Sequence, residues 1–368
     1  MKKGKILIIV GTRPEIIKIS PLIRYFIKHN ISFELLHTGQ HYSYNMDKIF
    51  FDELQLPLPD YFLEIGSGSD GYQIAEMMKR IEKLIFKIGV PKIVLIQGDT
   101  NTVLASALIC NRLGIKVAHI EAGLRSYDKS MPEEINRILT DHISDYLFAP
   151  TSISKNNLLK EGIDKKKIFV VGNTVVEAVK QNLPMAYSKI GKGFLKELNV
   201  KPKEFFLLTL HRRENVDKKE KLEEILEGLK EIKKRYKIPI LFPIHPRTVK
   251  NLKSFNMEKE ISFLNILEPM GYLQFLLLIK NSRIVLTDSG GIQEESCILK
   301  VPCVTLRENT ERPETLEVGA NILAGWKKER ILEGMGKMFE KKCKWKNPFG
   351  DGKTSERIYN IIKNGCKS

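Results

Sequence analysis

The chain has 368 residues, 42% of them hydrophobic and 28% charged, which is the composition of a globular protein with about two domains. No apolar stretch reaches the roughly 18 residues that a membrane span needs, and the N-terminus reads as a strand rather than a signal peptide, so we expect a cytoplasmic protein with no membrane partner. The net charge of +16 suits nucleic acid, an acidic small-molecule substrate or a solvated surface, and the lysines beside glutamates at residues 218–234 favour the last.

Apolar periodicity predicts alternating strands and helices through the first half of the chain. Strands are predicted at residues 5–10, 33–37, 61–65, 93–96, 116–120, 146–149 and 168–171, with helices at 14–29, 44–54, 72–88, 101–112, 132–143 and 151–160. Such alternation is typical of βαβ units, whose strands form a parallel sheet covered on both faces.

After residue 172 the pattern weakens, and polar and glycine residues between 182 and 193 suggest a linker. Alternation then resumes, with strands predicted at residues 205–210, 239–244, 263–267, 283–287 and 303–306 and a last helix at 354–363. We therefore predict an α/β fold of two Rossmann-like, doubly wound domains, residues 1–172 and 173–352, facing across a cleft. Ligands of such domains bind at the carboxyl ends of the strands.

Polar residues gather in the loops that follow the predicted strands. Six such segments are Gly11-Thr-Arg-Pro-Glu15, Thr38-Gly-Gln-His41, Gln97-Gly-Asp-Thr100, Glu121-Ala-Gly-Leu-Arg125, His211-Arg-Arg-Glu-Asn215 and His245-Pro-Arg247. A capping box of Thr12 and Glu15 would explain part of the first loop, but it leaves Arg13 and Lys18 unexplained. One charged loop is often a solvated turn, whereas six at the same ends of two sheets indicate a site.

The segment from Thr287 to Glu295 places a glycine turn between a strand and a helix. Gly290 and Gly291 would let a phosphate approach the free N–H groups at the start of the helix. An ordinary helix start, with Asp288 or Ser289 as N-cap, is the alternative.

Other patterns are weaker. Gly66-Ser-Gly-Ser-Asp-Gly71 matches the dinucleotide fingerprint but lies in the third βα unit, and Tyr44 with Lys48 matches the YxxxK pair of nicotinamide-dependent epimerases but precedes that glycine segment. The five cysteines are scattered and never form CxxC, so we expect neither a disulfide framework nor a metal site.

Seven motifs together carry a resemblance to a known family: Gly11-Thr-Arg-Pro-Glu15, Gln97-Gly-Asp-Thr100, Glu121-Ala-Gly-Leu-Arg125, Pro132-Glu-Glu134, His211-Arg-Arg-Glu214, Thr287 to Glu295 and Glu311-Arg-Pro-Glu314. From about residue 5 to about residue 355 the chain resembles the non-hydrolysing UDP-N-acetylglucosamine 2-epimerases. The resemblance implies the GT-B architecture, with a C-terminal helix at 353–368 returning to the N-terminal domain. It also implies a homodimer that interconverts UDP-GlcNAc and UDP-ManNAc and needs neither NAD nor metal.

The resemblance implies elimination of UDP to a 2-acetamidoglucal and re-addition with the C2 proton delivered to the opposite face. The residues that match the family's catalytic groups are Asp99, Glu121, Glu133 and His211. Three of them have structural alternatives: Asp99 could cap the helix predicted from residue 101, Glu133 could form a capping box with Ser130, and His211 could bridge two loops. Glu121 has no such alternative.

Further positions match the family's ligand-binding residues. Those expected near UDP and its diphosphate are Arg13, Lys18, Arg212, Ser289, Gly290, Gly291, Glu295 and Arg312. Gln40 and His41 match a second site at which bacterial members bind an activating UDP-GlcNAc. Here Tyr-Ser follows that pair, and the loop between Arg125 and Pro132 is slightly short, which argues against activation.

Three alternatives remain open. A hydrolysing relative would release ManNAc and UDP, a GT-B glycosyltransferase would transfer the sugar, and a nucleic-acid-binding protein would use the net positive charge. The carboxylates argue against the glycosyltransferase, and the dispersed lysines argue against a nucleic-acid partner.

Overall fold

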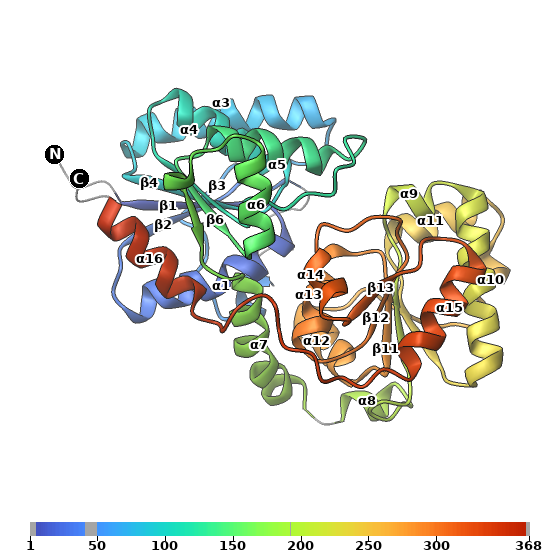
Figure 1. The fold of residues 1–368 in the computed structure, drawn as a ribbon. Coiled ribbons are helices and arrows are strands. Elements are labelled where there is room, and N and C mark those ends of the chain that lie inside the picture. Colours follow the sequence, from blue (N-terminus) through green and yellow to red (C-terminus); the bar gives the residue numbers. More distant parts are fainter. Residues whose placement is uncertain (1–4, 41–49, 192, 366–368) are drawn as a thin grey trace. The chain divides into compact units, whose positions relative to one another are not determined.

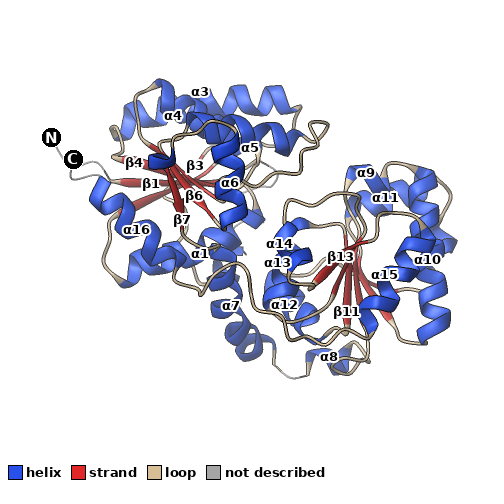
Figure 2. Ribbon diagram, in the orientation of Figure 1, coloured by secondary structure: helices blue, strands red, loops and turns tan. Residues whose placement is uncertain are grey.

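The computed structural model describes residues 5–40, 50–191 and 193–365 of the chain. The chain divides into two compact units, one of Met1–Ala178 with Phe349–Ser368 and the other of Val179–Pro348. Each unit contains one parallel sheet with helices on both of its faces (Figures 1 and 2). The predicted α/β fold with two Rossmann-like sheets is confirmed.

The first sheet has seven strands in the order β3-β2-β1-β4-β5-β6-β7. Their bounds are β1 Ile6–Val10, β2 Phe33–His37, β3 Tyr61–Phe62, β4 Ile93–Gln97, β5 Val117–Ile120, β6 Tyr146–Ala149 and β7 Ile168–Val170. The strand order reverses between β1 and β4, and in open parallel sheets ligands bind beyond the carboxyl ends of strands at this switch point.

Two helical layers cover the first sheet. Its helices are α1 Arg13–Lys28, α3 Asp70–Ile88, α4 Asn101–Arg112, α5 Pro132–Ile143, α6 Ser152–Lys160, the 3-10 turn η1 Lys165–Lys167 and α16 Thr354–Gly365. Helix α7, Thr174–Ile190, begins in the first unit and continues into the second. Helices α3, α4 and α5 form one layer, and α16 returns from the end of the chain to pack beside α1 (Figure 1). Phe26 of α1 and Tyr359 of α16 make an edge-to-face ring contact at 5.8 Å, which anchors the last helix to the first unit.

The second sheet has six strands in the order β10-β9-β8-β11-β12-β13, with its switch point between β8 and β11. Its strands are β8 Phe206–Thr209, β9 Ile240–Pro243, β10 Asn265–Leu267, β11 Ile284–Thr287, β12 Cys303–Thr305 and β13 Asn321–Leu323. Its helices are α8 Phe194–Glu197, α9 Arg213–Val216, α10 Lys219–Tyr236, α11 Pro246–Ser254, η2 Glu258–Ile261, α12 Tyr272–Asn281, α13 Gly290–Ile298, α14 Pro313–Glu317 and α15 Lys328–Phe339. An apolar core of this unit lies between the sheet and the layer that contains α10, α11 and α15.

Two predictions of secondary structure were wrong. The expected linker after residue 172 is the long helix α7, in which Val175, Val179, Asn182 and Ala186 recur at helical spacing and are buried. Pro184 lies inside this helix and misled the prediction, because proline usually ends a helix. Strand β13 at Asn321–Leu323 was not predicted from the sequence.

The helix predicted at residues 44–54 is helical at residues 50–53, while His41, Tyr44 and Lys48 lie outside the described residues. None of the helices in the described ranges is long and apolar enough to cross a membrane.

Candidate functional site

Two predicted carboxylates lie at the carboxyl ends of neighbouring strands in the first unit. Asp99 follows β4 and Glu121 follows β5, and each forms an ion pair with a basic residue from a helix. Lys18 Nζ lies 2.7 Å and 2.8 Å from the two carboxylate oxygens of Glu121. Arg137 donates from Nε and Nη2 to Oδ2 of Asp99 at 2.9 Å and 2.5 Å. The cations therefore fix the orientation of both carboxylates.

Glu121 has an unusual backbone conformation. Its φ of 71° lies in the left-handed region, which costs a non-glycine residue about 1–3 kcal/mol and persists only where surrounding contacts enforce it. Asn173, just after β7, adds a side-chain hydrogen bond to Glu121 Oε1 at 2.9 Å. Two side-chain partners, Lys18 and Asn173, therefore hold the carboxylate of this strained residue in place.

The capping interpretations of Asp99 and Glu133 were wrong. The N-cap of α4 is Thr100, and the carboxylate of Asp99 bonds to Arg137. The N-cap of α5 is Met131, which lies after Ser130, so Ser130 and Glu133 do not form the expected box. Ser130 bonds through both its N–H and its hydroxyl to Asp128. Glu133 lies half-buried in the first turn of α5.

The neighbouring Glu134 has a structural function. It is buried and accepts the N–H groups of Ser126 and Tyr127 at 2.9 Å and 2.8 Å. It also accepts a hydrogen bond from Nη1 of Arg137 at 2.7 Å, so one arginine joins it to Asp99. Glu134 thus holds the loop before α5 against the arginine that orients Asp99.

The predicted capping box of Thr12 and Glu15 is also absent. Thr12 is the N-cap of α1 but makes no side-chain capping bond within the described part of the chain. Glu15 instead accepts the N–H of Gly11 at 2.6 Å and the hydroxyl of Thr100 at 2.5 Å. Burial raises the pKa of Glu15 to about 7, although these hydrogen bonds oppose the shift. The carboxyl group therefore joins the loops on both sides of the switch point.

Arg13 and Gln40 occupy the same edge of the sheet. The guanidinium of Arg13 lies 4.9 Å from the centre of the Phe50 ring, in a cation–π contact. Gln40 is buried, and its Oε1 accepts the N–H and the hydroxyl of Thr102 at 3.1 Å and 2.8 Å. Gln40 thereby fixes its loop to the start of α4.

In the second unit, His211 and Asp288 follow the two strands of the switch point, β8 and β11. Asp288 is fully buried and accepts the N–H groups of His211 and Arg212 at 2.9 Å and 2.8 Å, so its interpretation as the N-cap of α13 was wrong. Nε2 of His211 lies 3.7 Å from Oδ1 of Asp288. Burial lowers the pKa of His211, and Asp288 partly opposes that shift. The centres of the His211 and His245 rings are 5.4 Å apart.

Helix α13 begins at the predicted glycines, with Ser289 as its N-cap. Arg312 lies against Gly290, since a Cβ atom built there would come within 2.9 Å of the guanidinium. This arginine is buried and pairs with Glu294 at 3.3 Å and Glu311 at 3.1 Å. Glu295, one turn into α13, is also buried. The structure therefore brings Ser289, Gly290, Gly291, Glu295 and Arg312 together around one helix start.

Sequence reasoning missed Arg137, Asn173 and Asp288 as site residues. Asn173 follows a strand, as the other site residues do, so the same rule would have found it. Arg137 lies four residues after Glu133 on the same helix, a spacing that places both on one side. Asp288 was noticed but interpreted as a cap.

The glycine segment from Gly66 to Gly71 follows β3, which lies at the edge of the first sheet. A dinucleotide fingerprint occupies the turn after the central strand, so this position does not suit it. Within the described residues no group of three or more histidine, cysteine, aspartate or glutamate side chains is arranged to hold a metal ion.

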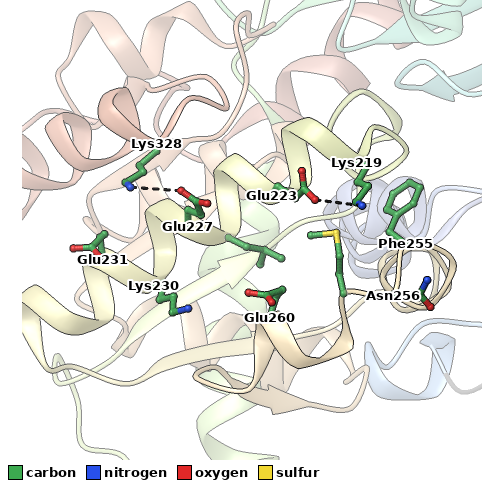
Figure 3. A pocket seen from close by; sticks show the side chains of 11 residues that line it. Lys219, Glu223, Glu227, Lys230, Glu231, Phe255, Asn256, Glu260 and Lys328 are labelled. Atoms are coloured by element: carbon green, nitrogen blue, oxygen red, sulfur yellow. Dashed lines mark hydrogen bonds and ion pairs between the residues drawn. The ribbon is translucent and has the colours of Figure 1, made fainter.

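A surface groove of about 550 Å³ lies in the second unit, along α10 (Figure 3). Leu226, Phe255 and Met257 contribute apolar side chains, and charged residues surround them. Two ion pairs form within the groove, Lys219 with Glu223 at 3.6 Å and Lys328 with Glu227 at 3.5 Å. The loops at the switch point do not line this groove, so the groove is separate from the candidate site.

The two Rossmann-like sheets, with carboxylates in one unit and a glycine-initiated helix in the other, place the chain in the GT-B class of folds. The family model described as UDP-N-acetylglucosamine 2-epimerase matches residues 26–363. The chain belongs to the UDP-N-acetylglucosamine 2-epimerase family.

Proteins with this family name are similar to the chain over nearly its whole length. A UDP-N-acetylglucosamine 2-epimerase of Methanocaldococcus jannaschii is 58% identical over 98% of this chain and 99% of its own. One of Methanococcus maripaludis is 56% identical over 97% and 98%. The crystal structure of the M. jannaschii enzyme in complex with UDP-GlcNAc and UDP superposes with a TM-score of 0.92, covering 98% of this chain and 100% of that one.

Proposed function

We propose that this protein epimerises UDP-GlcNAc and UDP-ManNAc reversibly at C2 without hydrolysing them. The observation that carries the proposal is the pair of cation-held carboxylates, Asp99 and Glu121, after adjacent strands of one sheet. The M. jannaschii relative, crystallised with UDP-GlcNAc and UDP, supports the choice of substrate.

The chemistry explains the need for carboxylates. The C2 hydrogen of the sugar is not next to a carbonyl, so its removal is difficult unless the anomeric C1–O bond breaks in the same process. A carboxylate takes the C2 proton while the electron pair forms the C1–C2 double bond and UDP departs. Re-addition of UDP to C1, with a proton delivered to the opposite face of C2, gives the epimer. Asp99, Glu121 and Glu133 are the groups we assign to these proton transfers.

The basic residues suit the departing UDP. Lys18 forms an ion pair with Glu121, and Arg13 lies at the same edge of the sheet. Cations of this kind stabilise the negative charge that develops on a leaving diphosphate.

In the second unit we assign UDP to the start of α13, where backbone N–H groups and the helix dipole favour a phosphate. His211 and Arg212 lie at the switch point of the same sheet, and we assign them to the diphosphate and the sugar. Glu295 would accept hydrogen bonds from the ribose hydroxyls, and Arg312 supports the helix start by packing against Gly290.

Incubation of UDP-GlcNAc in deuterated water without NAD, followed by proton NMR, tests the proposal. We expect UDP-ManNAc with deuterium at C2, because the abstracted proton exchanges with solvent. Free ManNAc with UDP would indicate the hydrolysing alternative. UDP-ManNAc without deuterium would indicate hydride transfer and would contradict the elimination.

A further inference from the structure

A buried histidine–aspartate pair joins the two loops that contain Asp99 and Glu121. Nε2 of His119, on β5, lies 2.8 Å from the carbonyl oxygen of Gly98, and Nδ1 lies 2.7 Å from Oδ1 of Asp141, on α5. Both side chains are completely buried. Oδ2 of Asp141 accepts the N–H of Gly123 at 3.1 Å. One chain of hydrogen bonds therefore runs from the residue before Asp99 to the second residue after Glu121.

The partners of His119 determine its protonation. A carbonyl oxygen only accepts hydrogen bonds, so Nε2 carries a proton. Nδ1 faces a carboxylate whose other oxygen is engaged by Gly123 and by Nη1 of Arg125 at 2.7 Å, which keeps that carboxylate ionised. A ring that donates to both of these acceptors is doubly protonated, and this imidazolium is part of the bridge inferred below.

The charges around this imidazolium balance. Arg125 pairs with Asp141 and also, through Nε and Nη2, with Glu161 at 2.7 Å and 2.6 Å. Two positive and two negative side chains thus lie together, and His142 flanks the partly exposed Glu161, with its Nε2 3.7 Å from Oε2. Burial raises the pKa of Asp141, but His119 and Arg125 together hold it below its ordinary value. A balanced, fully hydrogen-bonded cluster is the arrangement in which buried charges are tolerated.

The two loops need such support. Glu121 has φ 71°, a left-handed conformation that persists in a non-glycine residue only where contacts enforce it, and the turn before Asp99 depends on Gly98, whose φ is 91°. We propose that His119 and Asp141 are positioning residues whose imidazolium–carboxylate bridge holds Asp99 and Glu121 at the separation that epimerisation requires. This inference rests on the proposed function for its kinetic consequence, but the bridge itself is testable without substrate.

Nitrogen NMR of protein labelled at its histidine rings tests the bridge. His37 is an internal reference, because its Nδ1 accepts the N–H of Gly39 at 2.9 Å and burial lowers its pKa to about 4. At pH 7 we expect two protonated nitrogens for His119 and one unprotonated nitrogen for His37. Asp141→Asn assigns the His119 signals by shifting them. An unprotonated His119 nitrogen at pH 7 would overturn the proposal.

Kinetics test the positioning. In His119→Gln both N–H donors lie on one nitrogen atom instead of on two separate ring nitrogens, so the bridge between the two partners is broken. We therefore expect kcat for C2 exchange to fall about 100-fold through displacement of the carboxylates, with UDP affinity unchanged. Asp145→Asn is the matched control, since Asp145 accepts the N–H of Val117 at 2.9 Å at the opposite end of the same strand. We expect this control to keep its kcat.

Each kinetic outcome has a distinct meaning. Wild-type kcat in a folded His119→Gln, or equal losses in His119→Gln and Asp145→Asn, would contradict positioning. Should His119→Gln fail to fold, Asp141→Asn serves in its place. Absence of C2 exchange in the wild-type protein would overturn the proposed function, whereas the two nitrogen signals would still report the bridge.

Discussion

Glu15 illustrates how one buried carboxyl group can serve structure at a ligand site. It accepts hydrogen bonds from Gly11, after β1, and Thr100, after β4, and so joins the loops that contain Arg13 and Asp99. Because burial raises its pKa to about 7, the folded protein retains this proton at pH values where an unfolded chain has released it.

This proton makes stability depend on pH. Below the unfolded pKa of 4.5 the stabilisation is complete, and it is lost as the pH rises to about 7, a difference of about 3 kcal/mol. Glu15→Gln resembles the protonated acid, with an oxygen for Gly11 and an amide donor for Thr100. We expect the variant to match the wild type near pH 4.5 and to exceed its free energy of unfolding by about 3 kcal/mol above pH 7.

Urea denaturation of both proteins from pH 4.5 to 8 measures this difference. Groups that titrate in both proteins cancel in the comparison. Parallel pH profiles for the two proteins would show that Glu15 is ionised in the folded protein throughout.

At the scale of the element, the start of α13 contains two glycines with different surroundings. Gly290 faces the guanidinium of Arg312, which Glu294 and Glu311 hold in place. Around Gly291 no described atom comes within 4 Å of a built Cβ position. The first glycine is thus required by packing within the protein, and the second leaves room for a ligand.

Alanine substitutions separate the two requirements. We expect Gly290→Ala to destabilise the protein by about 1–3 kcal/mol, because the new methyl group must displace a held arginine. Gly291→Ala should leave stability unchanged or slightly higher, since alanine favours helix, but should weaken UDP binding. Thermal unfolding and calorimetric UDP titration measure the two effects. Normal UDP binding by a folded Gly291→Ala would argue against a phosphate at this position.

At the scale of the whole molecule, the proposed chemistry is divided between two units. The proton-transfer carboxylates belong to the first sheet, and the proposed UDP site belongs to the second. Substitutions should therefore fall into two classes, those that affect C2 exchange and those that affect binding of free UDP.

Glu121→Gln and Glu295→Ala represent the two classes. We expect Glu121→Gln to lower kcat by about 10²- to 10⁴-fold, as for loss of a general base, with free UDP bound as in the wild type. Glu295→Ala should weaken UDP binding about tenfold or more through loss of a charged acceptor. Calorimetry with UDP and deuterium exchange at C2 provide the two measurements. Wild-type UDP affinity in Glu295→Ala would refute our placement of the nucleotide.

The sequence by itself determined the fold and most of the candidate residues. Strands β2 and β6 and helices α4 and α5 have the predicted bounds, because buried parallel strands and amphipathic helices leave local apolar patterns. The loops after the strands could be predicted to lie close together, because the carboxyl ends of parallel strands share one edge of a sheet. The start of helix α13 at the two glycines was also predicted from the sequence.

Only the tertiary structure decided what holds these residues. Glu15 and Asp288 looked like helix caps, yet both accept hydrogen bonds from backbone or side chains of neighbouring loops. His119 lies within a strand and was not predicted as a candidate residue, although its ring forms hydrogen bonds with Gly98 and Asp141. Such contacts join residues that are distant in sequence and depend on which strands become neighbours, so no local pattern records them.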